Sequence, residues 1–299
     1  MCSKPWFYGK NIVITGTSSG IGFHLAKLFA TKYACNVYGL GRNVLKLENG
    51  KKIIDEQLQA SLQKQTQNGK SKIKVGSYNF LTCDVSSFES FSNFKKSLDE
   101  KNFKVDIVIN NAGVIFEFDR FENQDLEKVK KLFEINFYSH LYSYKLFSED
   151  LKQTKGMLVN ISSSSALCPI VGQAVYSASK GAIKNFTEAI RVENKKDFKV
   201  LLVCPGFVKT DLFREQKKMS KLVQSVSMNA NKASKKIVRA IAWKKRRVVI
   251  GFDSFLMNSF YKFFPRSSVG AISGVLKASH DPTFEKVYSV EKIERKEKV

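Results

Sequence analysis

Short apolar runs alternate with longer amphipathic or polar segments along most of this chain. The apolar runs have the length of buried strands, and the segments between them are long enough for helices. Such an alternation predicts a doubly wound α/β fold, in which a parallel sheet carries helices on both faces. We expect strands at 11–14, 36–40, a run ending at 83, 105–109, 157–161 and 200–203, and helices at 20–33, from about 86 onwards, at 123–153 and at 175–194.

The polar segment 43–72 is rich in Gln and Lys, which predicts a long exposed helix followed by a loop. Hydrophobic residues make up 43% of the 299 residues, and no Pro- or Gly-rich linker divides them. We therefore expect one domain at 1–251, followed by a C-terminal extension at 252–299.

A glycine-containing turn follows the first expected strand, at the point where a helix should begin. Gly16 permits a tight turn, Gly20 lets the backbone approach a ligand, and Gly22 lets the helix lie close to the strand. The unpaired amides at the start of a helix attract anions. This strand, turn and helix predict a site for the pyrophosphate of a dinucleotide, off the carboxyl ends of the strands.

The formal net charge of +23 would suit a nucleic-acid-binding protein, but the lysines are scattered over the whole length. We interpret them mainly as a solvated surface and expect no nucleic-acid partner. The cofactor, an acidic carrier protein and a lipid surface stay open as anionic partners.

The five cysteines and three histidines show no paired spacing, so we expect reduced thiols and no metal site. Neither a signal peptide nor a membrane-spanning run is evident, which predicts a cytoplasmic protein.

Residue types suited to proton transfer follow the later strands. Tyr176 and Lys180 stand four positions apart on an expected helix, so both side chains face the same side. A tyrosine is protonated at neutral pH, and a nearby ammonium and an oxidised nicotinamide favour its phenolate. Tyr176 could thus exchange a proton with a carbonyl or an alcohol, while the Ser163 hydroxyl donates to the same oxygen.

These motifs, in this order, resemble the short-chain dehydrogenase/reductase family over residues 8–251. The resemblance implies a Rossmann-type sheet, with Tyr176 as general acid/base and Lys180 lowering its pKa and bonding the nicotinamide ribose. It also implies that Asn136 holds a water in a proton relay. Ser163 is chosen among its neighbours because the family places its serine thirteen residues before the tyrosine.

The resemblance also implies which residues surround the cofactor. Asp84 would bond the adenine, the run 110–113 would support the sheet centre and the adenosine side, and 205–210 would border the nicotinamide amide. The expected cofactor-binding residues are Gly16, Thr17, Ser18, Ser19, Gly20, Ile21, Gly22, Arg42, Asn43, Asp84, Val85, Asn111, Ala112, Gly113, Tyr176, Lys180, Pro205, Gly206, Val208 and Thr210.

The residues after the second strand favour NADP over NAD. An NAD enzyme of this kind usually carries a carboxylate there, which bonds the ribose 2′-hydroxyl. This chain reads Gly41-Arg42 instead, and a guanidinium can bond a 2′-phosphate, with Thr17 and Ser18 as further donors. The alternative is that Arg42 merely covers the adenine face.

An apolar stripe with helical spacing follows residue 251, and a basic cluster at 244–247 precedes it. The stripe comprises Phe252, Phe255, Leu256, Phe260, Phe263 and Phe264. We expect it to cover the substrate cleft or a subunit interface, with contact to a membrane surface as the alternative. Solvent exposure of the stripe is the outcome we least expect. Whether the stripe is buried in protein or in a membrane surface, it suggests an apolar substrate.

The sequence thus predicts an NADP-dependent oxidoreductase that transfers a hydride between NADPH and an apolar carbonyl or alcohol, such as a lipid-like ketone, a steroid-like ring or an acyl thioester. We expect a homodimer or homotetramer. The alternative function is a non-catalytic NADP-binding sensor on the same fold.

Overall fold

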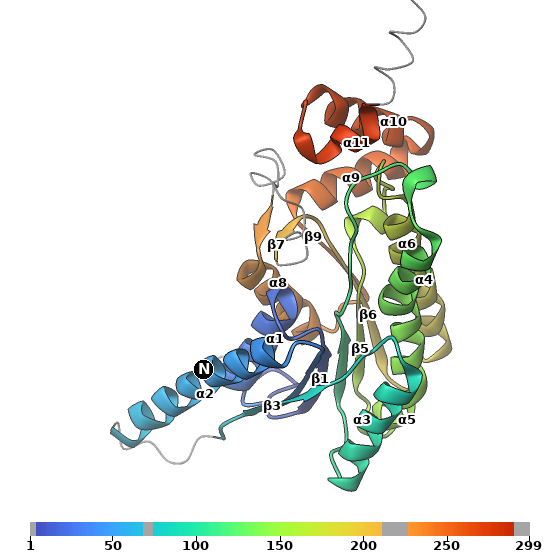
Figure 1. The fold of residues 1–299 in the computed structure, drawn as a ribbon. Helices are drawn as coiled ribbons and strands as arrows, with labels where there is room; N and C mark the ends of the chain where they lie inside the picture. Colours follow the sequence, from blue (N-terminus) through green and yellow to red (C-terminus); the bar gives the residue numbers. More distant parts are fainter. Residues whose placement is uncertain (1–3, 68–73, 211–226, 290–299) are drawn as a thin grey trace, which may run out of the picture.

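The computed structural model describes residues 4–67, 74–210 and 227–289, and Figure 1 shows the course of the chain. Seven parallel strands form one sheet in the order β3-β2-β1-β4-β5-β6-β9. They are β1 (Asn11–Thr15), β2 (Asn36–Gly41), β3 (Ser77–Thr82), β4 (Ile107–Asn110), β5 (Met157–Ile161), β6 (Lys199–Pro205) and β9 (Arg247–Ile250). The strand order reverses between β1 and β4, which places a ligand crevice at their carboxyl ends.

Helices cover both faces of this sheet (Figure 1). One face carries α1 (Gly20–Tyr33), α2 (Val44–Gln67) and α8 (Ala230–Ala242), and the other carries α3 (Phe88–Glu100), α5 (Ser139–Thr154) and α6 (Ala174–Glu193). Along β1, Ile12 and Ile14 enter the core under the first set of helices, whereas Val13 enters the core under the second. This alternation follows from the two-residue period of a strand. The expected doubly wound α/β fold is confirmed.

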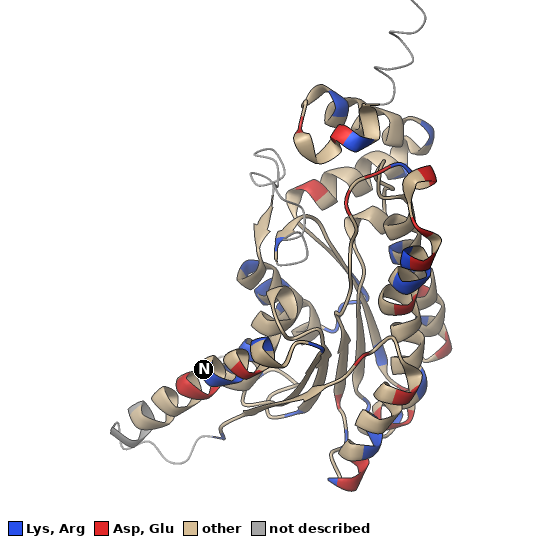
Figure 2. Cartoon of the chain, in the orientation of Figure 1, with Lys and Arg blue, Asp and Glu red and all other residues tan. Residues whose placement is uncertain are grey.

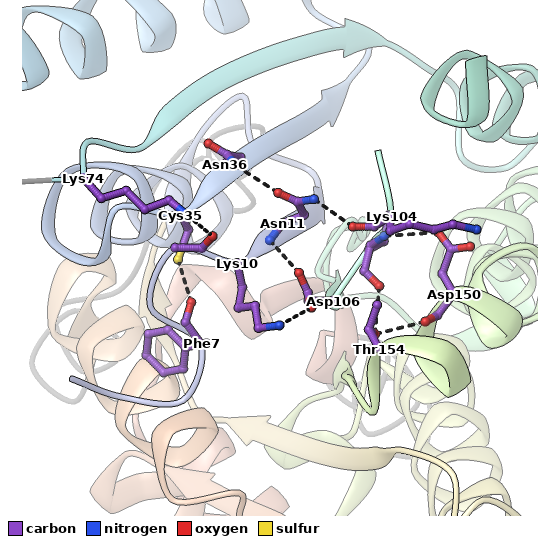
Figure 3. Close-up of polar contacts among 12 residues, drawn as sticks. Phe7, Lys10, Asn11, Cys35, Asn36, Lys74, Lys104, Asp106, Asp150 and Thr154 are labelled. Carbon is purple, nitrogen blue, oxygen red and sulfur yellow. Dashed lines mark hydrogen bonds and ion pairs between the residues drawn. The ribbon is translucent and has the colours of Figure 1, made fainter. Parts of the chain in front are cut away.

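Polar contacts fix the amino-terminal edge of the sheet (Figure 3). The Asp106 carboxylate, just before β4, accepts a hydrogen bond from the Asn11 backbone amide at 2.9 Å and pairs with Lys10 Nζ at 2.9 Å. The Asn11 side chain donates to the Lys104 carbonyl and accepts from Asn36 Nδ2. Because these contacts join β1, β2 and β4 at one end, they help to hold the register that aligns the opposite, carboxyl ends.

A π-helical turn interrupts the long helical segment expected at 123–153. After the short turn η1 (Phe121–Asn123), α4 (Leu126–Phe133) leads into η2 (Glu134–Tyr138), and α5 follows without a break. Single π-turns inside helices are frequent at functional sites. Here the turn contains Asn136, whose side chain is fully buried.

The remaining elements refine the expected boundaries. Helix α3 begins at Phe88, two residues after the expected start near 86, and the Ser87 hydroxyl oxygen accepts the capping hydrogen bond from the Ser90 amide. The strand expected at 105–109 lies at 107–110 instead. The sequence analysis missed α8, β9 and the short parallel pair β7 (Val208–Lys209) and β8 (Met228–Asn229). We expect substrate identity to depend on residues 207–230 and on the extension, and of these, residues 211–226 lie outside the described residues.

The C-terminal extension is helical, as expected. It contains α9 (Phe252–Phe263), α10 (Pro265–Ala278), η5 (Pro282–Phe284) and α11 (Glu285–Tyr288) at the carboxyl end of the sheet (Figure 1). The described residues include no helix that is both long enough and apolar enough to cross a membrane.

One expectation about this extension needs correction. Five of the six stripe residues, all but Phe260, are exposed in this chain rather than buried against its own cleft. The reason is that α9 turns its polar side toward the sheet, where Ser254 and Asp253 are hydrogen-bonded. The basic cluster lies at the amino end of β9, and its last residue, Arg247, donates a hydrogen bond to Asn258 Oδ1 of α9 at 3.3 Å.

Candidate active site

The turn between β1 and α1 has the geometry that its glycines predict. Gly16 and Gly20 have φ of 73° and 56°, the left-handed region that favours glycine. A Cβ on Gly22 would lie 2.1 Å from the Gly16 carbonyl oxygen, so only glycine allows α1 to pack this close. The Ser19 side chain does not cap α1. The first amides of the helix are therefore available to an anion.

A single cleft runs from this turn to the catalytic residues. Most of the expected site residues line it: Gly16, Ser18, Ser19, Gly20, Ile21, Arg42, Asp84, Val85, Asn111, Ala112, Gly113, Ser163, Tyr176, Lys180, Pro205, Gly206, Val208 and Thr210. Residues far apart in the sequence thus meet because the parallel strands all end at this edge. A side chain at Gly16 would meet the Ala112 backbone and Asn111 Nδ2, so glycine keeps the turn close to the end of β4 and leaves room for a ligand phosphate beside it.

Four expected site residues do not line the cleft. Thr17 is buried, and its Oγ1 accepts a hydrogen bond from the Tyr78 hydroxyl at 3.0 Å, so it supports the turn from behind. Gly22 acts through close packing. Asn43 accepts a hydrogen bond from the Lys46 amide at the start of α2, and Asn136 lies beneath the cleft.

Asn111 and Thr15 join the ends of the two central strands. Thr15 Oγ1 accepts hydrogen bonds from the backbone amides of Asn111 and Ala112 at 2.9 and 3.0 Å. In return, Asn111 Nδ2 donates to the carbonyls of Thr15 and Gly16. The glycine turn is therefore held against the end of β4, as expected for a residue run that supports the sheet centre.

Asp84 and Arg42 lie where the adenosine end is expected. The Asp84 carboxylate accepts hydrogen bonds from the Ser86 hydroxyl and amide at 2.6 and 3.0 Å. Burial opposes ionisation of Asp84, but these hydrogen bonds, with Lys131 and Arg42 nearby, hold its pKa below the ordinary value. Arg42 itself is exposed on the cleft wall.

Tyr176 and Lys180 occupy one side of α6 and are both buried. Lys180 Nζ lies 5.6 Å from the centroid of the Tyr176 ring. Burial raises the pKa of Tyr176 to about 12, against the opposing effect of a hydrogen bond with Ser163. Burial also lowers the pKa of Lys180 to about 8. At Tyr176 the effect of burial on the pKa thus outweighs that of the Ser163 hydrogen bond, and the lowering of this pKa by Lys180 stays a prediction.

Ser163 is placed by the short turn η3 (Ser164–Ala166) that follows β5. Its Oγ accepts a hydrogen bond from the Ser165 amide at 3.2 Å, so its hydroxyl proton remains available for donation. Next to it, Ser162 Oγ donates to the Lys180 carbonyl at 2.8 Å. The two serines thus tie the end of β5 to α6.

Asn136 lies directly behind this group. Its Oδ1 accepts from the Val114 amide at 2.7 Å, and its Nδ2 donates to the Val114 carbonyl and to Ser179 Oγ. A Cβ on Gly113 would lie 3.2 Å from both Asn136 Oδ1 and Lys180 Nζ. The Asn136 side chain is thus already engaged by the protein and holds the segment 113–114 beside Lys180.

The far end of the cleft is apolar, and the sequence analysis did not identify its residues. They are Val114, Ile115, Phe118, Ile170 and Phe207, with one buried polar side chain, Gln173. Gln173 Nε2 donates to the Phe116 carbonyl at 2.8 Å. Gln173 could have been found from the sequence because it lies three positions before Tyr176 on the chain. The apolar residues of the pocket belong to no motif that would have identified them.

Two buried residues of the C-terminal extension pack behind this apolar pocket. Phe284 packs edge to face on Phe118, with ring centroids 4.9 Å apart, and Val287 belongs to the same cluster as Ile170. Lys286 pairs with Glu117 at 2.6 Å. The extension therefore packs, through Phe284 and Val287, against the outer side of two cleft-lining residues, Phe118 and Ile170, and its role as a lid stays a prediction.

Comparison with known proteins agrees with this geometry. A profile of the family described as short chain dehydrogenase matches residues 10–221. The chain is 33% identical to 11-beta-hydroxysteroid dehydrogenase-like 2 of Arabidopsis thaliana, over 78% of this chain and 70% of that protein. It is 32% identical to human epidermal retinol dehydrogenase 2, over 69% of this chain and 62% of that protein.

The chain spans about half the length of another relative, 11-beta-hydroxysteroid dehydrogenase A of Sesamum indicum, matching 54% of it at 31% identity. Among solved structures, the alcohol dehydrogenase from Thermococcus sibiricus, in complex with 5-hydroxy-NADP, aligns with a TM-score of 0.67 and 24% identity, over 81% of this chain and 96% of that one.

A short-chain dehydrogenase/reductase from Burkholderia phymatum, in complex with NAD, aligns with a TM-score of 0.69 and 18% identity, over 81% of this chain and 89% of that one. These two structures share the fold of this chain. With the profile match over most of the chain, they lead to one conclusion: this protein belongs to the short-chain dehydrogenase/reductase family, whose members are nucleotide-binding oxidoreductases.

Proposed function

We propose that the protein is an NADP-dependent oxidoreductase that transfers a hydride between NADPH and an apolar carbonyl or alcohol. The observation that carries this proposal is the position of Tyr176, Lys180 and Ser163. They lie where the cleft that begins at the glycine turn meets the apolar pocket. A substrate oxygen at this point can reach the Tyr176 and Ser163 hydroxyls together.

Tyr176 is the proposed proton donor for carbonyl reduction. With a pKa of about 12 it is protonated at neutral pH, so it can donate to the oxygen that gains negative charge. Ser163 donates a second hydrogen bond to that oxygen. Lys180 is cationic below its pKa of about 8, and its charge favours the phenolate that remains. A bound nicotinamide supplies or accepts the hydride.

Arg42 supports the choice of NADP. It follows β2 and lines the cleft, and the neighbouring Gly41 offers no carboxylate to repel a 2′-phosphate. Ser18 lines the same part of the cleft. The proposed phosphate partner is therefore Arg42, with Ser18 as a further donor and without the contribution expected from Thr17, which is buried.

The substrate class follows from the apolar pocket. Five apolar side chains and one amide offer little to a charged substrate, whereas a lipid-like ketone or a steroid-like ring could bury its hydrocarbon there. The relatives named as hydroxysteroid and retinol dehydrogenases support this choice, since both names denote apolar alcohols.

The direct test is a turnover screen of hydroxysteroids, retinoids, small ketones and acyl thioesters with NADPH and with NADH. We expect turnover of an apolar ketone or aldehyde with NADPH at a kcat/KM at least tenfold above that with NADH. Tight NADPH binding without turnover of any substrate would instead favour a cofactor-sensing protein. The expected homodimer or homotetramer and the cytoplasmic location remain predictions, the first of which sedimentation velocity would test.

A further inference from the structure

Helix α9 presents an apolar face to the outside of the molecule. Phe252, Phe255, Leu256 and Phe263 recur at helical spacing, and Phe264 follows directly. All five are exposed, Phe252 at 78% and Phe263 at 72%. We call these five residues the α9 apolar face. Such a gathering differs from single exposed apolar residues, which are common on any protein surface.

The orientation of α9 is fixed by contacts on its other side. Asp253 Oδ2 accepts a hydrogen bond from the Phe207 amide at 2.7 Å, and Ser254 Oγ donates to the Cys204 carbonyl at 3.2 Å. Met257 packs on the cluster that contains Phe118. Helix α10 is joined to α9 by Ser268, whose hydroxyl donates to the Phe260 carbonyl at 3.1 Å. The apolar face therefore points outward as part of a docked helix.

The charged residues of the segment 254–280 are of one sign, and the next carboxylates along the chain are Asp281 and Glu285. Residues 254–280 contain Lys262, Arg266 and Lys277 and no Asp or Glu, and these three cationic side chains are exposed. The neighbouring carboxylate, Asp253, is turned toward the Phe207 amide. Elsewhere in the described chain Lys and Arg are interspersed with Asp and Glu along helices α3 to α6 (Figure 2).

We propose that the α9 apolar face, with Lys262, Arg266 and Lys277, docks the protein on the surface of an anionic lipid bilayer. Phenylalanine and leucine side chains can enter the boundary between headgroups and acyl chains, while lysine and arginine contact the headgroup phosphates. A second copy of the chain is a poorer occupant, because each copy has a net charge of +23 and brings the same cations to the contact.

The docked face would adjoin the substrate end of the cleft. Through Asp253 and Met257, α9 contacts Phe207 and the Phe118 cluster, and Phe118 and Phe207 line the cleft. An apolar substrate dissolved in the bilayer would thus meet the enzyme beside its pocket. Only this last consequence rests on the proposed function.

The test is co-sedimentation of the full-length protein with vesicles of phosphatidylcholine containing phosphatidylglycerol. The double variant Phe255→Ser/Phe263→Ser should reduce the partition coefficient at least tenfold. The matched control is Phe121→Ser, which changes a phenylalanine of similar exposure, 53%, in η1, and it should leave partition unchanged. Equal losses in the two variants, or no binding by the wild-type protein, would overturn the proposal.

The charge contribution is tested separately. Lys262→Gln/Arg266→Gln should weaken binding to the anionic vesicles roughly tenfold or more, since each cation near such a surface contributes on the order of 1 kcal/mol. The control, Lys195→Gln/Lys196→Gln, removes two exposed cations beyond the end of α6. Binding that is equally strong to pure phosphatidylcholine would contradict the assigned role of the cations.

Sedimentation velocity without lipid tests whether a second copy of the chain, rather than a bilayer, occupies the α9 apolar face. If Phe255→Ser/Phe263→Ser lowers the oligomeric state of the wild-type protein, the face is a subunit interface and the proposal is wrong. An unchanged oligomeric state with lost vesicle binding supports it. No measurement in this series uses catalysis, so failure here and failure of the proposed reaction are distinguishable.

Discussion

Burial sets the chemistry of the individual residues around Tyr176. Tyr176 and Lys180 are both largely removed from solvent, and burial disfavours the charged form of each. As a result, Tyr176 keeps its proton at neutral pH, and the pKa of Lys180, about 8, lies close to neutral pH. Motif spacing identified both residues, but the direction of the tyrosine shift depends on the depth of the site, which spacing does not reveal.

Arg42 provides the first prediction at this scale. Arg42→Ala should weaken NADPH binding by about 1.5–3 kcal/mol, the range for a hydrogen bond to a charged group, and leave NADH binding nearly unchanged. Dissociation constants from fluorescence titration would measure both. Arg191→Ala is the control, because Arg191 bonds the Arg246 carbonyl away from the cleft. Unaltered NADPH affinity in Arg42→Ala would contradict the bond to the 2′-phosphate and favour the alternative that Arg42 only covers the adenine face.

His140 predicts a pH dependence of stability. It is fully buried beside Ser139, and burial, with Lys180 nearby, lowers its pKa from 6.5 to about 3. Below pH 6.5 the unfolded chain therefore takes up a proton that the folded protein does not, so the free energy of unfolding falls as the pH falls.

Between about pH 7 and about pH 5.5, the wild-type protein should lose about 1 kcal/mol more stability than His140→Gln. Urea unfolding at the two pH values would measure this difference, and protonation of carboxylates cancels because it is common to both proteins. Parallel losses would mean that His140 titrates normally in the folded state.

At the scale of elements, the glycine turn and the π-turn differ in how far the sequence reveals them. The turn is predictable from Gly16, Gly20 and Gly22, because each of these positions requires glycine for a separate steric reason. The π-turn at Glu134–Tyr138 has no such signature, so 123–153 was predicted as plain helix. Strand β9 was not predicted because its four residues begin within the basic cluster at 244–247, whereas α8 was overlooked although its buried residues recur at helical spacing.

Gly22 and Gly181 allow a matched comparison of two helical glycines. Gly22→Ala should destabilise the protein by several kcal/mol and abolish dinucleotide binding, because the new Cβ would meet the Gly16 carbonyl at 2.1 Å. Gly181→Ala should stabilise it by about 0.5–1 kcal/mol, since nothing lies within 4 Å of its Cβ position. Thermal unfolding would measure both. Similar effects of the two substitutions would refute the close packing of α1 on the turn.

The C-terminal elements yield a prediction about substrate range. Phe284→Ala should raise KM at least tenfold for long apolar substrates and much less for small ketones, because it removes the ring that packs on Phe118. Steady-state kinetics would measure the change in KM for each of the two substrate types. Val275→Ala, on the exposed surface of α10, serves as control. A uniform change for all substrates would indicate that Phe284 stabilises the fold without shaping the pocket.

At the scale of the whole molecule, the order of strands was predictable where local pattern and fold rules agree. Alternating buried runs and helices leave few arrangements for a parallel sheet, and six of its seven strands were expected near their observed positions. The apolar pocket was not predictable, because Phe118, Ile170, Phe207 and Phe284 come from four separate segments. The exposure of the α9 apolar face was missed because an apolar stripe by itself does not reveal which side of a helix faces the protein.

The net charge also takes its meaning from the whole molecule. Lys and Arg lie on helices of both faces of the sheet rather than along one groove (Figure 2). This distribution agrees with a solvated surface. Two neighbouring segments lack Asp and Glu altogether, residues 227–252 with α8 and residues 254–280 with α9 and α10.

The central claim is that Tyr176 transfers the proton while NADPH transfers the hydride. Its most direct measurement is single-turnover reduction of an apolar ketone with NADPH deuterated at the transferring carbon, comparing the wild-type protein, Tyr176→Phe and the control Tyr142→Phe. We predict deuterium at the carbinol carbon of the wild-type product and at least a hundredfold slower reduction by Tyr176→Phe. NADPH affinity should stay within about twofold, and Tyr142→Phe should match the wild-type protein. Undiminished reduction by Tyr176→Phe, or a product without deuterium, would contradict the assigned mechanism.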